Sequence, residues 1–106
     1  MLHVVARIEL RPGARTRFLD EFRRLEPLVR DEDGCVEYVG VVDVPTAISA
    51  QTPVGEHVVL VVERWTDEAA LAAHLVAPHM AAYRERVADL VASTTIHVLG
   101  AVSGPV

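Results

Sequence analysis

Over the first third of the chain, the pattern of apolar and polar residues changes from the period of a strand to the period of a helix. Residues 2–10 are mostly Val, Ile and Leu, with polar side chains at alternate positions in part of the run, which is the period of a strand. Pro12-Gly13 interrupts this run, and from Ala14 onward apolar side chains recur at helical spacing. They are Phe18, Phe22, Leu25 and Val29. We expect an amphipathic helix that Pro27 weakens or kinks in its last turn and that Asp33-Gly34 closes.

The middle of the chain predicts two strands and a long connection. Residues 35–44 form the second strand, residues 45–55 carry several turn formers, and residues 57–65 form the third strand. Within the third strand, residues 58–62 are apolar at every position, whereas an antiparallel strand with one wet face should alternate. Both faces of the sheet are therefore expected to be covered.

The last third predicts a helical region and a fourth strand. Thr66 is the expected N-cap of a helix over residues 69–75, and Pro78 opens a second helical segment. The apolar stripe of that segment is Met80, Tyr83, Val87 and Leu90. Residues 93–102 form the fourth strand, and residues 103–106 form a short tail.

The order strand, helix, strand, strand, helix, strand predicts an α+β fold of the ferredoxin-like βαββαβ type, with helices on one face of an antiparallel sheet. The helices cover only one face, so the apolar third strand indicates that something outside the chain covers the other. A second copy of the same sheet is the simplest cover, because closed twofold dimers are the commonest assembly. We expect a homodimer whose two sheets meet in a barrel-like core.

Length and charge restrict the remaining possibilities. The chain has 106 residues, the usual size of one domain, so residues 1–106 are read as a single unit. The net charge is −5 and the Arg residues are scattered, so neither nucleic acid nor a membrane surface is an expected partner. The N-terminal run resembles neither a signal peptide nor a membrane span, and we expect a cytoplasmic protein. Cys35 is the only cysteine, which excludes a disulfide within the chain.

Several motifs together resemble the antibiotic biosynthesis monooxygenase domain family. They are Pro12-Gly13, Gly34-Cys35, Glu63-Arg64-Trp65, Ala73-His74 and Ala77-Pro78-His79-Met80. Val41-Val42-Asp43, the connection through Gln51 and residues 78–83 are similar to the quinol monooxygenase branch. The resemblance implies a dimeric α+β barrel that oxidises phenols or hydroquinones with molecular oxygen and needs no cofactor: no flavin, no haem and no metal. The same scaffold also hosts isomerases, decyclases and haem-degrading enzymes.

The chemistry of such a reaction indicates two candidate catalytic residues. A hydroquinone must lose a proton to become the reductant for oxygen, so the protein must supply a base and a dry pocket. His74 lies beside Leu75 and one turn after Leu71, so its ring should point toward the sheet, as a base or as a core histidine. His79 follows Pro78 at a helix start, which favours neutral imidazole and suits either a base or a structural role.

Candidate substrate-binding residues are aromatic, apolar or acidic. Trp65 could stack on a quinol ring, although a large residue at a strand end is often core. Glu63 and Asp43 could orient a histidine or accept a phenolic hydrogen bond, or serve only as strand charges. The remaining candidates for the pocket wall are Tyr38, Met80 and Tyr83, which ordinary helix and strand packing explains equally well.

Departures from other branches narrow the activity. Haem-degrading members carry a Trp where this chain has His74, a haem-ligating His where it has Arg84, and an Asn near Ala6, so haem degradation is disfavoured. The actinorhodin-pathway type carries an Asn at the position of Val61. On one unbroken helix His74 and His79 would point roughly 140° apart, which disfavours a shared metal ion. The alternatives are an isomerase or lyase acting on a small oxygenated metabolite, and a non-catalytic dimer that binds a small molecule.

Overall fold

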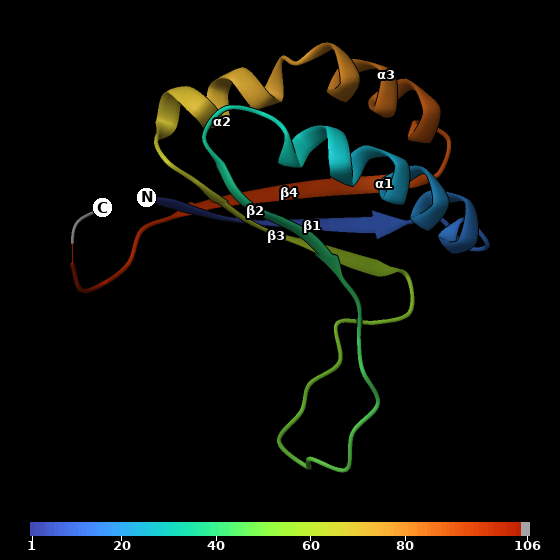
Figure 1. Ribbon diagram of the computed structural model, residues 1–106. Coiled ribbons are helices and arrows are strands. Elements are labelled where there is room, and N and C mark those ends of the chain that lie inside the picture. Colours follow the sequence, from blue (N-terminus) through green and yellow to red (C-terminus); the bar gives the residue numbers. More distant parts are fainter. Residues whose placement is uncertain (105–106) are drawn as a thin grey trace.

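A four-stranded antiparallel sheet carries three helices on one of its faces (Figure 1). The fold is taken from a computed structural model of the chain, which describes residues 1–104. The elements are β1 (Leu2–Leu10), α1 (Arg15–Arg30), β2 (Cys35–Val41), β3 (Val58–Trp65), α2 (Glu68–Leu75), α3 (Pro78–Val87) and β4 (Val91–Leu99). Of the predicted tail at 103–106, only the first two residues lie within the described part.

The strand order β2-β3-β1-β4 confirms the ferredoxin-like α+β fold. The two central strands are β3 and β1, and every neighbouring pair is antiparallel. At the centre of the sheet Ala6 of β1 lies opposite Val61 of β3 on one side and Ile96 of β4 on the other. All three side chains therefore share the face that the helices cover.

The core lies between that face and α1. The four apolar residues with helical spacing in α1 are all buried, as the sequence predicted. Phe22 packs directly against the backbone of Gly40 in β2. A side chain at Gly40 would prevent this contact, because its Cβ would lie 2.6 Å from Phe22 Cε2. The Phe22 ring also stacks on Tyr38 of β2, with ring centroids 5.7 Å apart. Helix α1 thus packs directly on β2 and carries aromatic rings to the sheet.

The strand boundaries differ from the predicted ones because partner strands and loop contacts end the ladders. Strand β2 stops at Val41 rather than at residue 44, because Asp43 instead accepts hydrogen bonds from the backbone N–H groups of Val54 and Gly55, both at 2.9 Å. Strand β4 starts at Val91, two residues early, and its pairing with β1 ends where Leu99 meets the start of β1. Residues 100–104, which follow, are in no strand.

The helix starts also need correction. Asp67, and not Thr66, is the N-cap of α2, because its extended backbone lets Oδ1 accept the N–H of Ala70 at 2.8 Å. Helix α1 is not interrupted at Pro27 and continues to Arg30. Gly34, at φ +81°, makes the turn that follows.

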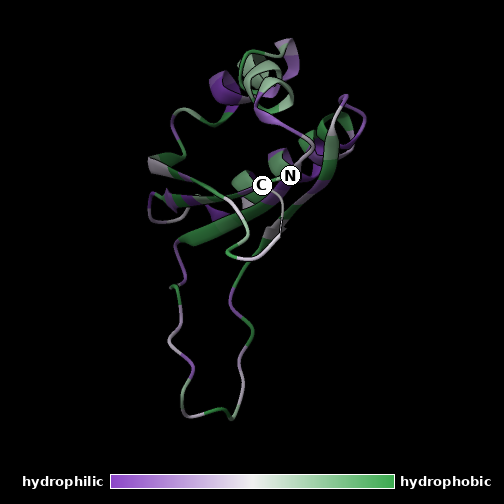
Figure 2. Ribbon diagram, turned by 90° about the vertical axis from the view of Figure 1, so that its left-hand side faces the viewer, coloured by the Kyte–Doolittle hydropathy of each residue, from purple (hydrophilic) through white to green (hydrophobic). Residues whose placement is uncertain are grey.

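The opposite face of the sheet carries no helix. Val62 lies at its centre, between Val39 of β2 and Val5 of β1, and all three are half-buried. Long stretches of the strands are hydrophobic, as the green colouring in Figure 2 shows. The connection at residues 42–57 projects beyond this face and carries charged residues only near its two ends (Figure 1).

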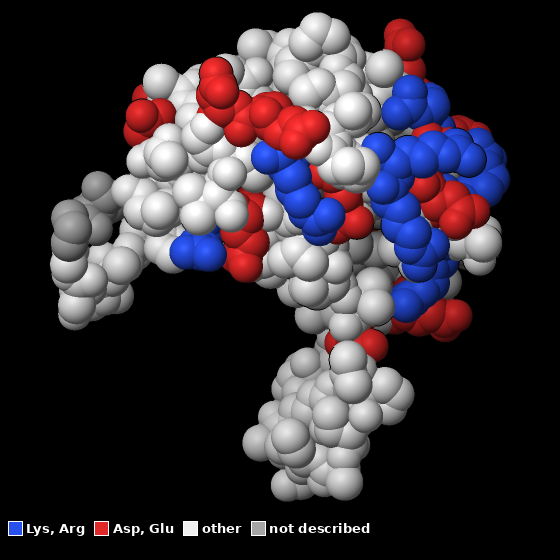
Figure 3. All heavy atoms as spheres, viewed as in Figure 1, with Lys and Arg blue, Asp and Glu red and all other residues white. Residues whose placement is uncertain are grey.

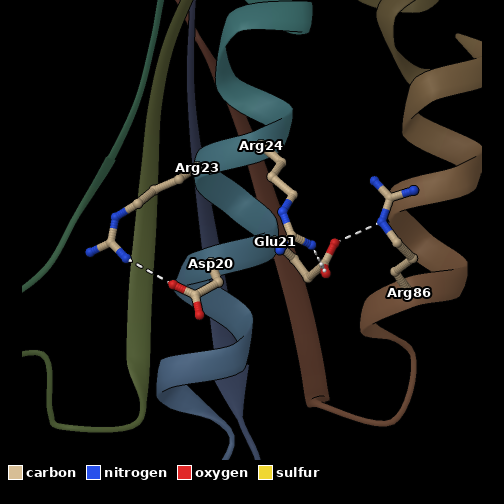
Figure 4. Close-up of polar contacts among 5 residues, drawn as sticks. All are labelled: Asp20, Glu21, Arg23, Arg24 and Arg86. Carbon is tan, nitrogen blue, oxygen red and sulfur yellow. Dashed lines mark hydrogen bonds and ion pairs between the residues drawn. The ribbon is translucent and has the colours of Figure 1, made fainter.

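Ion pairs tie the helices together at the surface. Basic and acidic side chains are interleaved around α1 in Figure 3. Glu21 of α1 accepts hydrogen bonds from Arg24, at 2.8 Å, and from Arg86 of α3, at 2.7 Å (Figure 4). These exposed pairs fix the position of α3 beside α1 but contribute little stability. No helix within residues 1–104 is long and apolar enough to cross a membrane.

Candidate active site

An apolar cavity of about 340 Å³ lies between the sheet and the helices α2 and α3. That volume suits a small ligand of one or two fused rings. The sheet contributes Val4, Ala6, Ile8, Tyr38, Val61, Glu63, Thr94, Ile96 and Val98, and the helices contribute Leu71, His74, Leu75, Met80, Tyr83, Arg84 and Val87.

The cavity exists because the helices leave β4 uncovered. Thr94, Ile96 and Val98 line the cavity, yet all three side chains are exposed. Elsewhere on the same face, Val4 and Val61 are almost completely buried under the helices. The cavity is therefore closed at the centre of the sheet and opens along β4.

His74 projects from α2 into the closed end of this cavity. Its side chain is 2% exposed and lies against Trp65 and Tyr38, with ring centroids 4.6 and 5.5 Å away. Nδ1 lies 2.9 Å from Glu32 Oε2, so it carries the proton that the carboxylate accepts. Nε2 is left as the unprotonated nitrogen. Burial lowers the pKa of His74, whereas the hydrogen bond that it donates to Glu32 and the charge of that carboxylate raise it, and His79 and Arg84 lower it further.

Glu32 brings the two candidate histidines together. Its Oε2 lies 2.7 Å from Nε2 of His79 as well as 2.9 Å from His74. The two rings can share one carboxylate because α2 ends at Leu75 and the extended backbone of Ala77 starts α3 in a new direction. The separation of roughly 140° expected for one unbroken helix does not apply, because the helix is broken before Pro78. Within residues 1–104 no cluster of three or more His, Cys, Asp or Glu side chains is placed to hold a metal ion.

Glu63 is a second titratable group on the cavity wall. Its side chain is buried, and Oε1 accepts the indole N–H of Trp65 at 2.9 Å. Burial raises the pKa of Glu63 from 4.5 to about 7, because the hydrogen bond from Trp65 offsets only part of the cost of desolvation. Near neutral pH this carboxyl group can therefore either donate or accept a proton.

Two tyrosines and a methionine complete the polarizable part of the wall. Tyr38 and Tyr83 are buried and line the cavity, and burial raises the pKa of both phenols. They therefore stay neutral and can donate hydrogen bonds. Met80 lies beside them on α3. Its flexible thioether can adapt to rings of different outline.

Sequence reasoning missed two residues of the site. Glu32 lies between Asp31 and Asp33, and a run of three acids after a helix looks like a solvated turn. Arg84 was considered only as a departure from haem-degrading enzymes, yet it lines the cavity. It makes no ion pair with any residue that the structure describes, and its charge favours an anion in the cavity.

Three of the predicted site residues lie away from the cavity wall. Asp43 accepts hydrogen bonds from Val54 and Gly55, which hold the ends of the connection at residues 42–57 together, and it is not part of the cavity lining. Trp65 is completely buried, packs against the His74 ring and donates its indole N–H to Glu63, and it is not part of the cavity lining. His79 lies behind Glu32, with a quarter of its side chain exposed.

Fold and cavity together define a ferredoxin-like α+β protein with an apolar small-molecule site. The sequence pattern of the family described as antibiotic biosynthesis monooxygenase matches residues 1–86. The chain belongs to this family, which confirms the resemblance seen in the sequence and makes the protein an enzyme of the monooxygenase class.

Relatives of the chain support this assignment. It is 40% identical over 101 residues to the protein named "Probable quinol monooxygenase YgiN" of Escherichia coli, with 93% of this chain and 96% of the relative covered. Among solved structures, PA3566 from Pseudomonas aeruginosa is 25% identical with a TM-score of 0.81, covering 96% of this chain and 94% of that one. Rv0793 from Mycobacterium tuberculosis is 25% identical with a TM-score of 0.79, covering 97% and 96%.

Proposed function

We propose that the chain is a cofactor-independent monooxygenase that oxidises a small hydroquinone or related phenol with molecular oxygen. The observation that carries the proposal is His74, whose Nδ1 is held by Glu32 so that Nε2 is the free base in an apolar cavity. The name of the Escherichia coli relative, which specifies a quinol, supports the substrate class.

In the first step of this proposal, Nε2 of His74 takes the proton of a phenolic hydroxyl. Burial keeps the imidazole neutral before the step, because it lowers the pKa of His74. The negative charge of the resulting phenolate is stabilised by Arg84 and by hydrogen bonds from Tyr38 and Tyr83, which line the same cavity. Water would solvate the phenolate and weaken it as a reductant, so the apolar walls favour the next step.

In the second step the phenolate reduces oxygen directly. One electron passes to dioxygen, and the two radicals combine to form a C–O bond, giving a ring peroxide anion. His74, neutral again once it has released the phenolic proton, moves the proton of that ring carbon to the outer peroxide oxygen, and the O–O bond then breaks to form a carbonyl and release hydroxide. The hydroxide combines with the phenolic proton that His74 released and leaves as water. For a hydroquinone the balance is one dioxygen consumed, one hydroxyquinone and one water formed.

The cavity also restricts the class of substrate. Its walls are mainly Val, Ile, Leu and Met side chains, so a flat apolar ring is favoured over a sugar or an amino acid. A second hydroxyl on the ring would meet Glu63, whose carboxyl group can accept or donate a hydrogen bond near neutral pH because its pKa is about 7.

The enzyme would act as a homodimer with each chain as one domain. The helix-free face of the sheet is apolar at its centre, where Val62 lies between Val5 and Val39. Val44 and Ile48, on the connection that projects beyond that face, are each 66% exposed. Light scattering should give the mass of two chains for the wild type, and Val62→Lys should give a monomer. A wild-type monomer would contradict this part of the proposal.

An isomerase or lyase is the second candidate function. The observation that favours it is the presence of two acid–base groups, His74 and Glu63, on one cavity wall. Such a pair could remove a proton from one carbon of an oxygenated metabolite and deliver one to another, without oxygen.

One experiment separates the two functions. Metal-free and flavin-free protein is incubated with a panel of reduced benzo- and naphthoquinones, in air and under argon, and the products are weighed by mass spectrometry. The monooxygenase requires air and yields a product that gains one oxygen atom over the quinone. Turnover under argon, with a product of the same mass as the substrate, would favour the isomerase.

A further inference from the structure

The carboxylate of Glu32 joins two histidines that come from different helices. Its Oε2 lies 2.9 Å from Nδ1 of His74, at the end of α2, and 2.7 Å from Nε2 of His79, at the start of α3. Glu32 itself lies in the turn between α1 and β2. Both distances are those of strong charge-assisted hydrogen bonds. The three side chains form a continuous chain of hydrogen bonds.

This chain leads from the cavity to the surface. The exposed fraction of the side chain rises from 2% at His74 to 13% at Glu32 and 25% at His79. Within residues 1–104 every buried side-chain nitrogen or oxygen has a hydrogen-bond partner. Nδ1 of His79 has no such partner in the described part of the chain, so it must be in contact with solvent.

We propose that His74, Glu32 and His79 form a proton relay that carries the proton of the substrate from the cavity to solvent. The proposal rests on the proposed function in one respect, because it takes His74 as the base that receives the proton. It adds a catalytic role for the relay and assigns Glu32 and His79 as residues that act through His74 and do not touch the substrate.

The relay is needed because a bound substrate blocks the other route. Before binding, Nε2 of His74 can exchange protons with water in the open cavity. A flat ring in that cavity displaces this water, and the Trp65 and Tyr38 rings pack against the imidazole. Arg84, which also lines the cavity, cannot accept a proton. The proton then leaves His74 through Nδ1, which is hydrogen-bonded to Glu32.

Each transfer along the relay moves one proton and no electrons. The phenolic O–H bond breaks and an N–H bond forms at Nε2 of His74. The proton on Nδ1 of His74 passes to Oε2 of Glu32, and from there to Nε2 of His79, which releases the proton on its Nδ1 to water. In the resting state Nε2 of His79 carries the proton that it donates to Glu32. Exchange with water moves that proton to Nδ1 before Nε2 accepts the proton from Glu32, and the transfer returns His79 to its resting form.

The relay can be tested without oxygen chemistry by using 4-nitrophenol, which oxygen does not oxidise and whose phenolate is yellow. Protein and 4-nitrophenol are mixed under argon in weak buffer at about pH 6, in a stopped-flow instrument. Phenolate formation is followed by its colour, and proton release to solvent by a pH indicator that absorbs elsewhere in the spectrum. The variants are His79→Gln, which keeps a donor near Nε2, Glu32→Gln, and His57→Gln as a control outside the cluster.

The relay predicts that phenolate formation and proton release share one time course in the wild type and in His57→Gln. In His79→Gln the phenolate should still form, but proton release should lag at least about tenfold, and imidazole added to the solvent should restore it. In Glu32→Gln both signals should slow. Equal time courses in His79→Gln would overturn the relay and leave His74 as the base. A wild type that forms no phenolate would overturn the base, and the relay with it.

Discussion

Replacing Glu63 by Gln should remove most of a pH dependence that this one carboxyl group imposes on stability. Glu63 is buried on the cavity wall, and burial raises its pKa from 4.5 to about 7. At 1.36 kcal/mol per pKa unit, that rise corresponds to about 3 kcal/mol of preference for the neutral acid in the folded state. Gln has nearly the same shape, and its amide oxygen can still accept the indole N–H of Trp65.

The sign follows from proton binding. Between about pH 4.5 and about pH 7 the folded state holds the proton of Glu63 while the unfolded state has lost it, so the free energy of unfolding falls as the pH rises. This loss is absent below about pH 4.5 and is complete above about pH 7. Gln does not titrate. Glu63→Gln should therefore match the wild type near pH 4.5 and exceed it by about 3 kcal/mol at about pH 8.

The assay is urea unfolding of both proteins at one protein concentration, at four values between about pH 5 and about pH 8. Other groups titrate equally in the two proteins, so the difference between their free energies of unfolding isolates Glu63. A difference that stays constant over this range would refute the reasoning. It would mean that the carboxylate is solvated and that water fills the base of the cavity.

Three further predictions concern local contacts. Gly34→Ala should cost more than about 2 kcal/mol of stability, because the new Cβ would lie 2.5 Å from a side chain of α2. Gly13→Ala has the same φ of +81° but nothing within 4 Å of the new Cβ, so it should cost about 1 kcal/mol. Equal losses of stability in urea unfolding would contradict the close approach at Gly34. Asp67→Ala should cost about 1 kcal/mol through loss of the N-cap of α2, and thermal unfolding unchanged from wild type would disprove the cap. Glu32→Gln should lower the pKa of His74, since the hydrogen bond and charge of Glu32 raise it, and a histidine titration by nitrogen-15 NMR that shows no fall would contradict the contact.

Much of the fold could be predicted because the strands and α1 carry strong periodic patterns. The apolar residues of α1 from Phe18 to Val29 and the continuous apolar run in β3 are local signals. The structure buries the α1 residues in the core together with Val59 and Val61 of β3, and it places Val62 on the helix-free face. The ends of the elements were harder to predict. They depend on long-range contacts, such as Asp43 bonding across the loop to Gly55, which no local pattern contains.

The site could be predicted only in part, for the same reason. His74 was predicted to face the sheet from its neighbours on one helix, and it is buried there. Glu32 could not be found, because it is 42 residues away in sequence and meets His74 only when the turn after α1 lies against α2 in the folded chain. The position of the His79 ring depended on how the chain turns at Val76 and Ala77, the two residues between α2 and α3, because this turn sets the direction of α3.

The central claim is that His74 accepts the phenolic proton of the substrate. The rate of oxygen consumption tests this claim most directly. Metal-free and flavin-free protein is given a reduced naphthoquinone, and uptake by the wild type is compared with uptake by His74→Gln after subtraction of spontaneous autoxidation. The account predicts catalysed uptake that falls by about 10²- to 10⁴-fold in the variant, with little change in substrate binding. Equal uptake by the two proteins would contradict His74 as the base, and uptake by the wild type no faster than autoxidation would contradict the proposed reaction itself.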